Sequence, residues 1–316
     1  MSTHDHDIAA GVLPATDAVM EKTASDGILR QYYELTKPGI SQMVALSTLA
    51  GYYLAIPTDV MTAVRSMDSW LHFGATMVGT LAISSGSCVM NHVMEREHDA
   101  RMKRTSTRPL PSGRITAGAA TVFGMALTIV GAALLWNVNM LTFLLAVATW
   151  AFYLAVYTPM KRTSSLALLV GGIPGALPFA GGWTAVRGTM DAPAWVLFAI
   201  LFFWQMPHFL ALSWMYRNDY REGGFVLRAL QDDSGKVLGV QMTLYSVCML
   251  VSILFPTILG VTGWLYAAGA SLLGLWLTAE SVRFVRIGDH AAARRVLLTS
   301  YAVLMGVLFL MFLDKA

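Results

Sequence analysis

The sequence predicts an all-α, polytopic membrane protein, a helical bundle of about nine transmembrane helices around a central cavity open to the cytoplasmic side. Two observations lead to this fold class. Of the 316 residues, 56% are hydrophobic and only 13% are charged, whereas soluble domains carry about 25% charged residues. The apolar residues also fall into separate runs of about 20, the length that a helix needs to cross a bilayer. We therefore expect a multi-pass membrane protein with no nucleic-acid partner.

The apolar runs divide the chain into a tail and one membrane domain. Residues 1–38 are polar and mixed in charge, which predicts a disordered cytoplasmic tail rather than a signal peptide or a transit peptide. Residues 39–316 form a single transmembrane domain. Its predicted spans are 39–57, 71–92, 116–136, 138–156, 166–186, 194–215, 237–257, 260–282 and 294–313.

The basic residues between these spans gather on one side of the membrane. The connections 95–115, 157–165, 216–236 and 283–293 are rich in lysine and arginine, and the opposite connections hold few. Basic loops stay in the cytoplasm. With an odd number of spans, this distribution places the N-terminus in the cytoplasm as well.

A coarse two-part pattern repeats along the chain. An apolar span followed by acidic and basic residues occurs at 71–115 and again at 194–236, and two such segments could converge over a cavity. Transporters also show weak internal symmetry, so the pattern alone does not select an enzyme. The span 166–186 contains Pro174 and Pro178 among many glycines. This composition predicts backbone that lines a cavity, close helix packing through small residues, or both.

The strongest functional signal follows the second span. Asn91, Glu95 and Asp99 stand at four-residue intervals, a step of about 400° and about 6 Å on a helix, so their side chains lie close to one face. Acids at the end of a membrane helix are costly to keep there and usually bind a cation or a substrate. Stacked oxygen ligands suit Mg²⁺ held jointly with a phosphate group. The alternative is an ordinary helix end with solvated acids.

Other charged residues extend this candidate site. Asp219, in the second acidic segment, is either a metal ligand from the opposite side of the cavity or an ordinary loop acid. Several cations could bind phosphate oxygens, the arginines in a bidentate fashion, although cytoplasmic loops are basic for topological reasons too. These cations are Arg104, Arg108, Lys161, Arg162 and Arg221.

His208 and Tyr216 complete the set of candidate residues. His208 follows Pro207 inside an apolar span. A lone histidine there is either a packed, hydrogen-bonded residue or a group that binds haem iron or moves a proton. Tyr216 and the nearby aromatic residues fit an interfacial belt, and aromatic faces also stabilise cations. Cys88 and Cys248 fall in apolar runs and predict buried thiols.

Taken together, the motifs resemble the intramembrane, UbiA-type prenyltransferase superfamily, and within it the branch that farnesylates protohaem IX. The resemblance covers roughly residues 33 to 312. Glu95 stands where the branch more often has aspartate, and Ala167 stands where asparagine is common. The matching residues are Asn91, Glu95, Asp99, Met102, Arg104, Thr105, Arg108, Pro109 and Leu110, then Tyr157, Thr158, Lys161, Arg162, Gly175, Ala176 and Pro178, then Trp204 to Phe209 and Asp219 to Gly223.

The resemblance implies a Mg²⁺-dependent prenyltransferase that transfers a farnesyl group from farnesyl diphosphate to the vinyl group of protohaem IX (haem b). Water adds in the same reaction, and the products are haem O and diphosphate. By this resemblance Asn91, Glu95, Asp99 and Asp219 hold the metal, and the five cations named above bind the diphosphate. His208 and Tyr216 are the implied haem contacts.

The same resemblance implies a bacterial inner membrane as the location, with the lipid bilayer as a partner. Further implied partners are a haem A synthase and assembly factors of terminal oxidases. Two alternatives stay open at this stage. One is prenylation of another acceptor, such as a quinone-precursor ring or chlorophyllide, and the other is a transporter of an anionic lipid or cofactor. Metal-dependent release of diphosphate separates an enzyme from a transporter.

Overall fold

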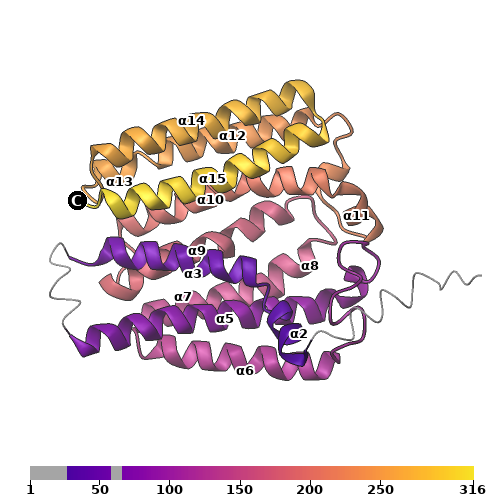
Figure 1. The fold of residues 1–316 in the computed structure, drawn as a ribbon, viewed down its shortest axis with the longest axis horizontal. Coiled ribbons are helices and arrows are strands. Elements are labelled where there is room, and N and C mark those ends of the chain that lie inside the picture. The colour runs from indigo at the N-terminus through magenta and orange to yellow at the C-terminus, as the bar shows by residue number, and fades with distance from the viewer. Residues whose placement is uncertain (1–26, 58–65) are drawn as a thin grey trace, which may run out of the picture.

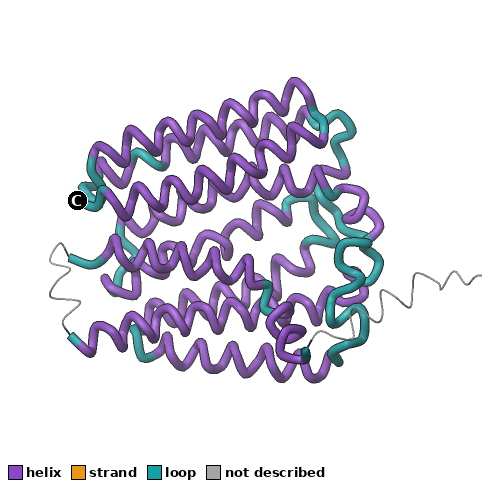
Figure 2. The backbone as a smooth tube through the Cα atoms, in the orientation of Figure 1, coloured by secondary structure: helices purple, strands orange, loops and turns teal. Residues whose placement is uncertain are grey.

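A computed structural model describes residues 27–57 and 66–316. Within these ranges the chain is helical apart from its loops and one isolated bridge between Thr262 and Lys315. The long helices lie roughly side by side in one bundle (Figure 1), and the loops gather at its two ends (Figure 2). Among the described residues, eight helices are long and apolar enough to cross a membrane. Together with α3, they confirm the expected bundle of about nine spans.

The elements, in chain order, have the following bounds. The helices are α2 (Ile28–Leu35), α3 (Pro38–Ala55), α5 (Met67–Asp99), α6 (Ala117–Trp136), α7 (Met140–Phe152), the π-helix η1 (Tyr153–Tyr157), α8 (Thr158–Met160), α9 (Ala167–Arg187), α10 (Ala192–Met215), α11 (Arg217–Glu222), the 3₁₀-helix η2 (Arg228–Leu230), α12 (Lys236–Ser252), α13 (Phe255–Ile258), α14 (Trp264–Ile287) and α15 (His290–Leu313).

Local sequence explains several helix ends. Thr116, Asn139 and Asp289 each precede a helix and accept a hydrogen bond from a backbone amide of its first turn, which satisfies one of the amides that a helix start leaves unpaired. The end of α9 at Gly188 uses a left-handed backbone conformation, with φ of 67°, which glycine adopts at little cost.

One difference from the sequence expectation concerns the tail. Residues 1–26 lie outside the described residues, so the predicted disorder of that part stays a prediction. Its last part forms α2, whose Leu35 is fully buried against Val89 and Leu110. A short helix therefore lies against the bundle immediately before the first membrane helix.

The helices pack in two groups that meet at α9 and α10. The first group pairs α5 with α6 and α3 with α9, and the second pairs α14 with α12 and with α15. Small residues allow the closest approaches: a Cβ atom at Gly182 of α9 would collide with the carbonyl of Thr48 on α3. Small interfacial residues of this kind let membrane helices pack backbone to backbone.

Helix α9 combines the two roles that its glycines and prolines predict. It is continuous although Pro174 and Pro178 lie inside it. Pro174, Pro178 and Gly181 line the central cavity, while Phe179 and Gly182 pack against α3. The helix therefore serves as cavity wall on one side and as a close packing surface on the other.

Candidate active site

A central cavity of about 350 Å³ runs through the first group of helices. At the end of the bundle that holds the C-terminus of α5, its wall is charged. Further in, it is mainly apolar and aromatic, with Ile83, Trp150 and Phe209, and it reaches Leu135 near the far end of α6. The charged lining residues are Lys37, Glu95, Asp99, Arg104, Arg108 and Lys161. The cavity thus suits a ligand with an anionic head and a long apolar tail.

The oxygen-bearing side chains of the first acidic segment come from one uninterrupted helix. Helix α5 has 33 residues, so the predicted span 71–92 and the acidic motif belong to the same element. Asn91, Glu95 and Asp99 are 0%, 5% and 3% exposed, and all three lie on the buried side of α5. Glu95 and Asp99 line the cavity, and Asn91 lies directly behind it.

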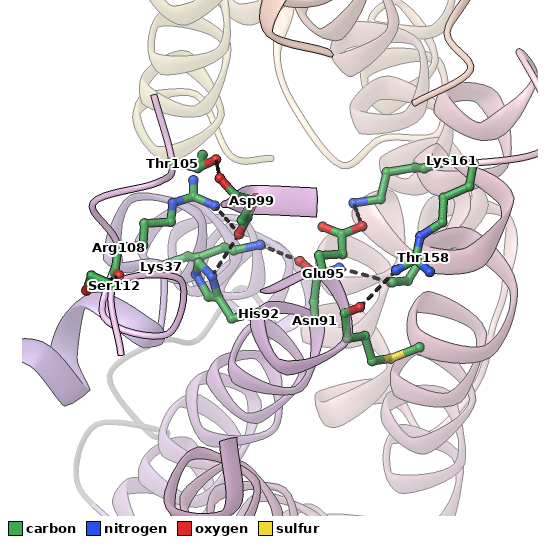
Figure 3. Close-up of polar contacts among 12 residues, drawn as sticks. Lys37, Asn91, His92, Glu95, Asp99, Thr105, Arg108, Ser112, Thr158 and Lys161 are labelled. Carbon is green, nitrogen blue, oxygen red and sulfur yellow. Dashed lines mark hydrogen bonds and ion pairs between the residues drawn. The ribbon is translucent and has the colours of Figure 1, made fainter. Parts of the chain in front are cut away.

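Each of these three side chains is paired with a cation from a different part of the chain (Figure 3). The ammonium of Lys37 donates to Asn91 Oδ1 over 2.6 Å. Lys161, which follows α8, forms an ion pair with Glu95 Oε1. Arg108, in the loop after α5, donates from Nη1 to Asp99 Oδ2 over 3.0 Å. Buried charges need such partners because an unpaired charge in a low-dielectric environment is very costly.

Lys37 owes its position to an unusual backbone conformation. Its φ of 49° makes it the one non-glycine residue with a positive φ within the described ranges, and such residues often mark functional sites. It directly precedes Pro38, the first residue of α3. Burial lowers the pKa of its ammonium, and the nearby carboxylate of Glu95 opposes that effect. The ammonium is thus held in the cavity wall, and the sequence predictions did not include it.

The surroundings of Asp99 fix the end of α5. Besides Arg108, Asp99 has His92 as a neighbour of its carboxylate, with His92 Nδ1 3.5 Å from Asp99 Oδ2. Its backbone carbonyl accepts from the hydroxyl of Thr105 over 2.7 Å, which folds the following loop back onto the helix. That loop carries Arg104 and Arg108, so these two cations line the cavity close to the Asp99 carboxylate at the end of α5.

The π-helix η1 supplies an aromatic part of the cavity wall. Tyr153 and Tyr157 both line the cavity, and the Lys161 ammonium lies 4.9 Å from the ring centroid of Tyr157. Thr158 links this wall to α5, since its hydroxyl accepts from Asn91 Nδ2 over 3.0 Å and donates to the Tyr153 carbonyl over 2.9 Å. Single π-turns inside helices are frequent at functional sites.

The second acidic segment covers the charged end of the cavity. Phe225 packs with Met102, and His98 donates from Nδ1 to the Gly223 carbonyl over 2.7 Å. The guanidinium of Arg104 lies 5.7 Å from the ring centroid of Tyr220, and Tyr220 and Phe225 line the cavity. Burial raises the pKa of the Tyr220 phenol, so the phenol stays protonated. The two segments therefore converge over the cavity, as the two-part pattern indicates.

Some predicted site residues lie away from the cavity lining. Asp219 is half-buried in α11, and no described hydrogen bond or ion pair joins it to the acids of α5. Arg221 is exposed and reaches only Asn218, at 3.5 Å. Arg162 donates to the carbonyl of Met94 over 2.8 Å. Their predicted roles stay predictions.

The two predicted haem contacts also lie outside the cavity lining. The ring of His208 stacks on Trp204, with centroids 5.1 Å apart, and its Nδ1 lies 2.9 Å from Ser300 Oγ. Tyr216 stacks under the guanidinium of Arg104 at 5.0 Å. The α10 residues that line the cavity are Gln205, Phe209, Leu212 and Ser213.

The sequence predictions missed several lining residues for different reasons. Lys37 carries a recognisable signal. It stands directly before a proline and a membrane span, where removing a charged side chain from water costs much free energy. Tyr157 belongs to the motif that carries the resemblance but was given no role, and Tyr153 carries no signal, since a π-turn does not alter the apolar pattern of the span. Tyr220 was assigned to an interfacial belt.

The donor set on α5 fits a hard divalent cation. Two carboxylates and one amide oxygen on a buried helix face are the ligand types that Mg²⁺ prefers, with its remaining positions filled by phosphate oxygens and water. Among the described residues, no three His, Cys, Asp or Glu side chains come together as a metal site. The arrangement thus favours a cation that arrives with a phosphate-bearing ligand.

Comparisons with known proteins agree with this architecture. Residues 45–313 match the model of the UbiA prenyltransferase family. The chain is 41% identical over 290 residues to the protoheme IX farnesyltransferase of Solibacter usitatus, covering 91% of this chain and 99% of that protein. It is 39% identical over 288 residues to the protein of that name from Salinibacter ruber, covering 91% and 99%.

Solved structures share the fold at low sequence identity. A digeranylgeranylglyceryl phosphate synthase superposes with a TM-score of 0.73 at 18% identity, covering 90% of this chain and 97% of that one. A UbiA homologue from Archaeoglobus fulgidus bound to GPP and Mg²⁺ superposes with a TM-score of 0.62 at 12% identity, covering 89% and 99%.

Proposed function

The chain belongs to the UbiA prenyltransferase family, and from that premise we propose that it transfers the farnesyl group of farnesyl diphosphate to a vinyl group of protohaem IX. The observation that carries the proposal is the cavity: a charged end continues into a long apolar and aromatic interior. This form matches an isoprenoid diphosphate, and the similarity to protoheme IX farnesyltransferases over nearly the whole chain supports haem as the acceptor.

The charged end holds the diphosphate. Arg104, Arg108 and Lys161 line it and donate hydrogen bonds to the phosphate oxygens, on which negative charge builds as the leaving group departs. Arg162 and Arg221 remain predicted contributors from just outside the lining. Asn91, Glu95 and Asp99 would hold Mg²⁺ on the diphosphate, with Asp219 as a predicted ligand from α11. When bound, the metal supplies further neutralisation of the leaving group.

The inner part of the cavity holds the farnesyl chain and protects the reacting carbon. Cleavage of the bond between C1 and oxygen leaves an allylic cation, which water would capture in an open site. Tyr153 and Tyr157 line the cavity there, and aromatic faces stabilise a cation. The same residues exclude bulk water from C1.

Carbon–carbon bond formation then uses the electrons of the haem vinyl group. Its terminal carbon bonds to C1 of the farnesyl group, and the positive charge moves to the vinyl carbon next to the porphyrin ring. Water adds to that carbon and loses a proton, which gives the hydroxyethylfarnesyl side chain of haem O. His208 and Tyr216 remain the predicted haem contacts.

We further propose a bacterial inner membrane as the location, with the charged end of the cavity and the N-terminus in the cytoplasm. A haem A synthase and terminal-oxidase assembly factors would be its partners. Single cysteines placed at Ser106 and Glu222 test the orientation. Both should react only with reagents that reach the cytoplasm, and reaction of either from outside contradicts the proposed topology.

A direct assay tests the reaction. Purified protein in lipid nanodiscs is incubated with haem b, farnesyl diphosphate and Mg²⁺, and the products are identified by mass spectrometry with diphosphate measured in parallel. We expect haem O and an equal amount of diphosphate, both lost on chelation of Mg²⁺. A farnesylated quinone precursor in place of haem O would assign another acceptor. Movement of substrate across the membrane without diphosphate release would indicate a transporter.

A further inference from the structure

The three candidate metal ligands are already occupied by cations of the protein itself. Asn91 accepts from Lys37, Glu95 pairs with Lys161, and Asp99 pairs with Arg108. The Lys37, Lys161 and Arg108 side chains come from three separate segments and converge on one helix face (Figure 3). A metal ion that binds the Asn91 oxygen, Glu95 Oε1 or Asp99 Oδ2 must compete with these three cations.

From this arrangement we infer that Lys37 is a diphosphate-binding residue, and that it occupies Asn91 until a Mg²⁺–diphosphate pair replaces it. The inference deepens the proposed function and rests on it. On binding, Asn91, Glu95 and Asp99 would hold the metal. Lys37, Lys161 and Arg108 transfer to the phosphate oxygens. Each cation thus exchanges one anionic or polar partner for another and stays paired throughout.

The charges that line the cavity favour this exchange. The charged side chains are four cations, Lys37, Arg104, Arg108 and Lys161, and two carboxylates, Glu95 and Asp99. A divalent cation alone would raise an existing positive excess and leave three partly buried cations of the cavity wall without these partners, which is costly. A diphosphate carries more negative charge than one Mg²⁺ compensates, so the pair together balances the site.

The position of Lys37 suits a transfer of this kind. Its ammonium lines the cavity, and the hydrogen bond described for it goes to Asn91 Oδ1. The other side of the Asn91 amide is fixed, because Nδ2 donates to Thr158. The oxygen of Asn91 therefore stays in place when the lysine leaves, and the flexible lysine stem provides the movement.

The consequence is reciprocal coupling between two ligands. Mg²⁺ and the diphosphate should each raise the affinity of the other by at least about 10-fold, within the range usual for coupled sites. Isothermal titration calorimetry on the full chain in nanodiscs measures this, with farnesyl S-thiolodiphosphate as an unreactive probe. Mg²⁺ is titrated with and without the probe, and the probe with and without Mg²⁺.

Lys37→Met separates Lys37 from the other cations. We expect the variant to bind Mg²⁺ alone more tightly than the wild type, because Asn91 is free, and to bind the probe about 10-fold more weakly, because a charge-assisted contact is lost. The factor by which Mg²⁺ and the probe raise each other's affinity should fall accordingly. Lys37→Arg keeps the charge and should recover most of the affinity for the probe.

Lys103→Met is the matched control. Lys103 is exposed in the loop after α5 and does not line the cavity, so its loss changes the net charge at the same end by the same amount. Solvent and salt screen such a charge, and we expect all affinities to stay within about 2-fold of the wild type.

Two outcomes overturn the inference. One is that, in the wild type, Mg²⁺ and the probe do not change each other's affinity. This measurement does not depend on the folding of any variant. The other is a Lys37→Met variant whose affinity for Mg²⁺ alone is unchanged while both ligands weaken in parallel, which assigns Lys37 a purely structural role. If haem O forms normally in either case, the proposed function stands. If no farnesylated haem forms although the coupling is present, the proposed function falls alone.

Discussion

The two acidic segments, in 71–115 and 194–236, follow the same pattern in the sequence but contribute different residues to the cavity. In the first, Asn91, Glu95 and Asp99 are buried at the cavity with cationic partners. In the second, Asp219 is half-buried in α11 and does not line the cavity. The second segment contributes Tyr220 and Phe225 instead. In the proposed function the first segment would therefore bind the diphosphate head, and the second would cover it.

The difference originates in helix continuity. Helix α5 runs without interruption to Asp99, so the buried face of the membrane span continues through the acidic motif at the same helical phase. Helix α10 ends at Met215, and Tyr216 leaves the helical conformation with φ of −107° and ψ of 23° before α11 begins. That break changes the direction in which Asp219 points. Spacing along the sequence predicts a shared face only while the helix continues.

The largest expected effect contrasts the two acids directly. Asp99→Asn should lower kcat by at least about 10³-fold, because the lost charge stabilises the departing diphosphate and its metal. Asp219→Asn should lower it by less than about 10-fold, since partly solvent-screened charges contribute little. Quantitative mass spectrometry of haem O gives both rates, and gel filtration checks that the variants remain folded. Equal losses in the two variants would contradict the division of roles between the segments.

Glu95 should give the next largest effect. Glu95→Gln removes the charge that pairs with Lys161 and should lower kcat by about 10²-fold. Glu95→Asp keeps the charge on a shorter arm and restores the aspartate expected from the resemblance, so it should retain activity within about 10-fold of the wild type. The relevant comparison is the ratio of the kcat values of the two variants. If both lose activity alike, arm length matters more than charge, and the proposed metal contact at Glu95 is wrong.

His208 should give a smaller and more selective effect. If it contacts haem as predicted, His208→Ala should weaken haem binding several-fold and shift the haem absorption spectrum, with the affinity for farnesyl diphosphate unchanged. Its stacking on Trp204 and contact with Ser300 define the competing role in packing. A lower Tm together with an equal loss of affinity for both substrates would remove His208 from the haem site.

The smallest expected effect concerns the cover formed by the second segment. Tyr220→Leu keeps an apolar side chain but removes the aromatic face beside Arg104. Turnover should fall only modestly, while the share of farnesol among the products should rise, because water reaches the allylic cation more often. Gas chromatography of the extracted products measures that share. An unchanged product ratio would show that the segment does not protect the cation.

The sequence predicts the fold well because each helix is marked by its own residues. The predicted spans 116–136 and 194–215 differ by only one or two residues from Ala117–Trp136 and Ala192–Met215, since apolar runs with polar ends define membrane helices. The face shared by the acids of α5 was equally predictable, because it depends on one helix alone.

Features that depend on contacts between elements were not predictable. Lys37 has a left-handed backbone conformation, and its ammonium bonds to Asn91 on another helix. The π-turn of η1 is followed by Thr158, whose hydroxyl donates to the Tyr153 carbonyl. The direction of Asp219 depends on a helix break that no proline or glycine marks. None of these follows from the apolar pattern of the spans.

The length of α5 has a consequence for how the enzyme meets its substrate. At about 1.5 Å per residue, its 33 residues extend about 50 Å, well beyond the hydrocarbon thickness of about 30 Å. With its apolar part in the hydrocarbon layer, the acids at its end are expected at the depth of the lipid phosphates and the apolar cavity among the acyl chains. An isoprenoid diphosphate dissolved in the leaflet already has this orientation, so it can enter by lateral diffusion without leaving the bilayer. The rate should then depend on the mole fraction of the isoprenoid in the lipid, and diluting the membrane with inert phospholipid should slow the reaction at constant bulk concentration.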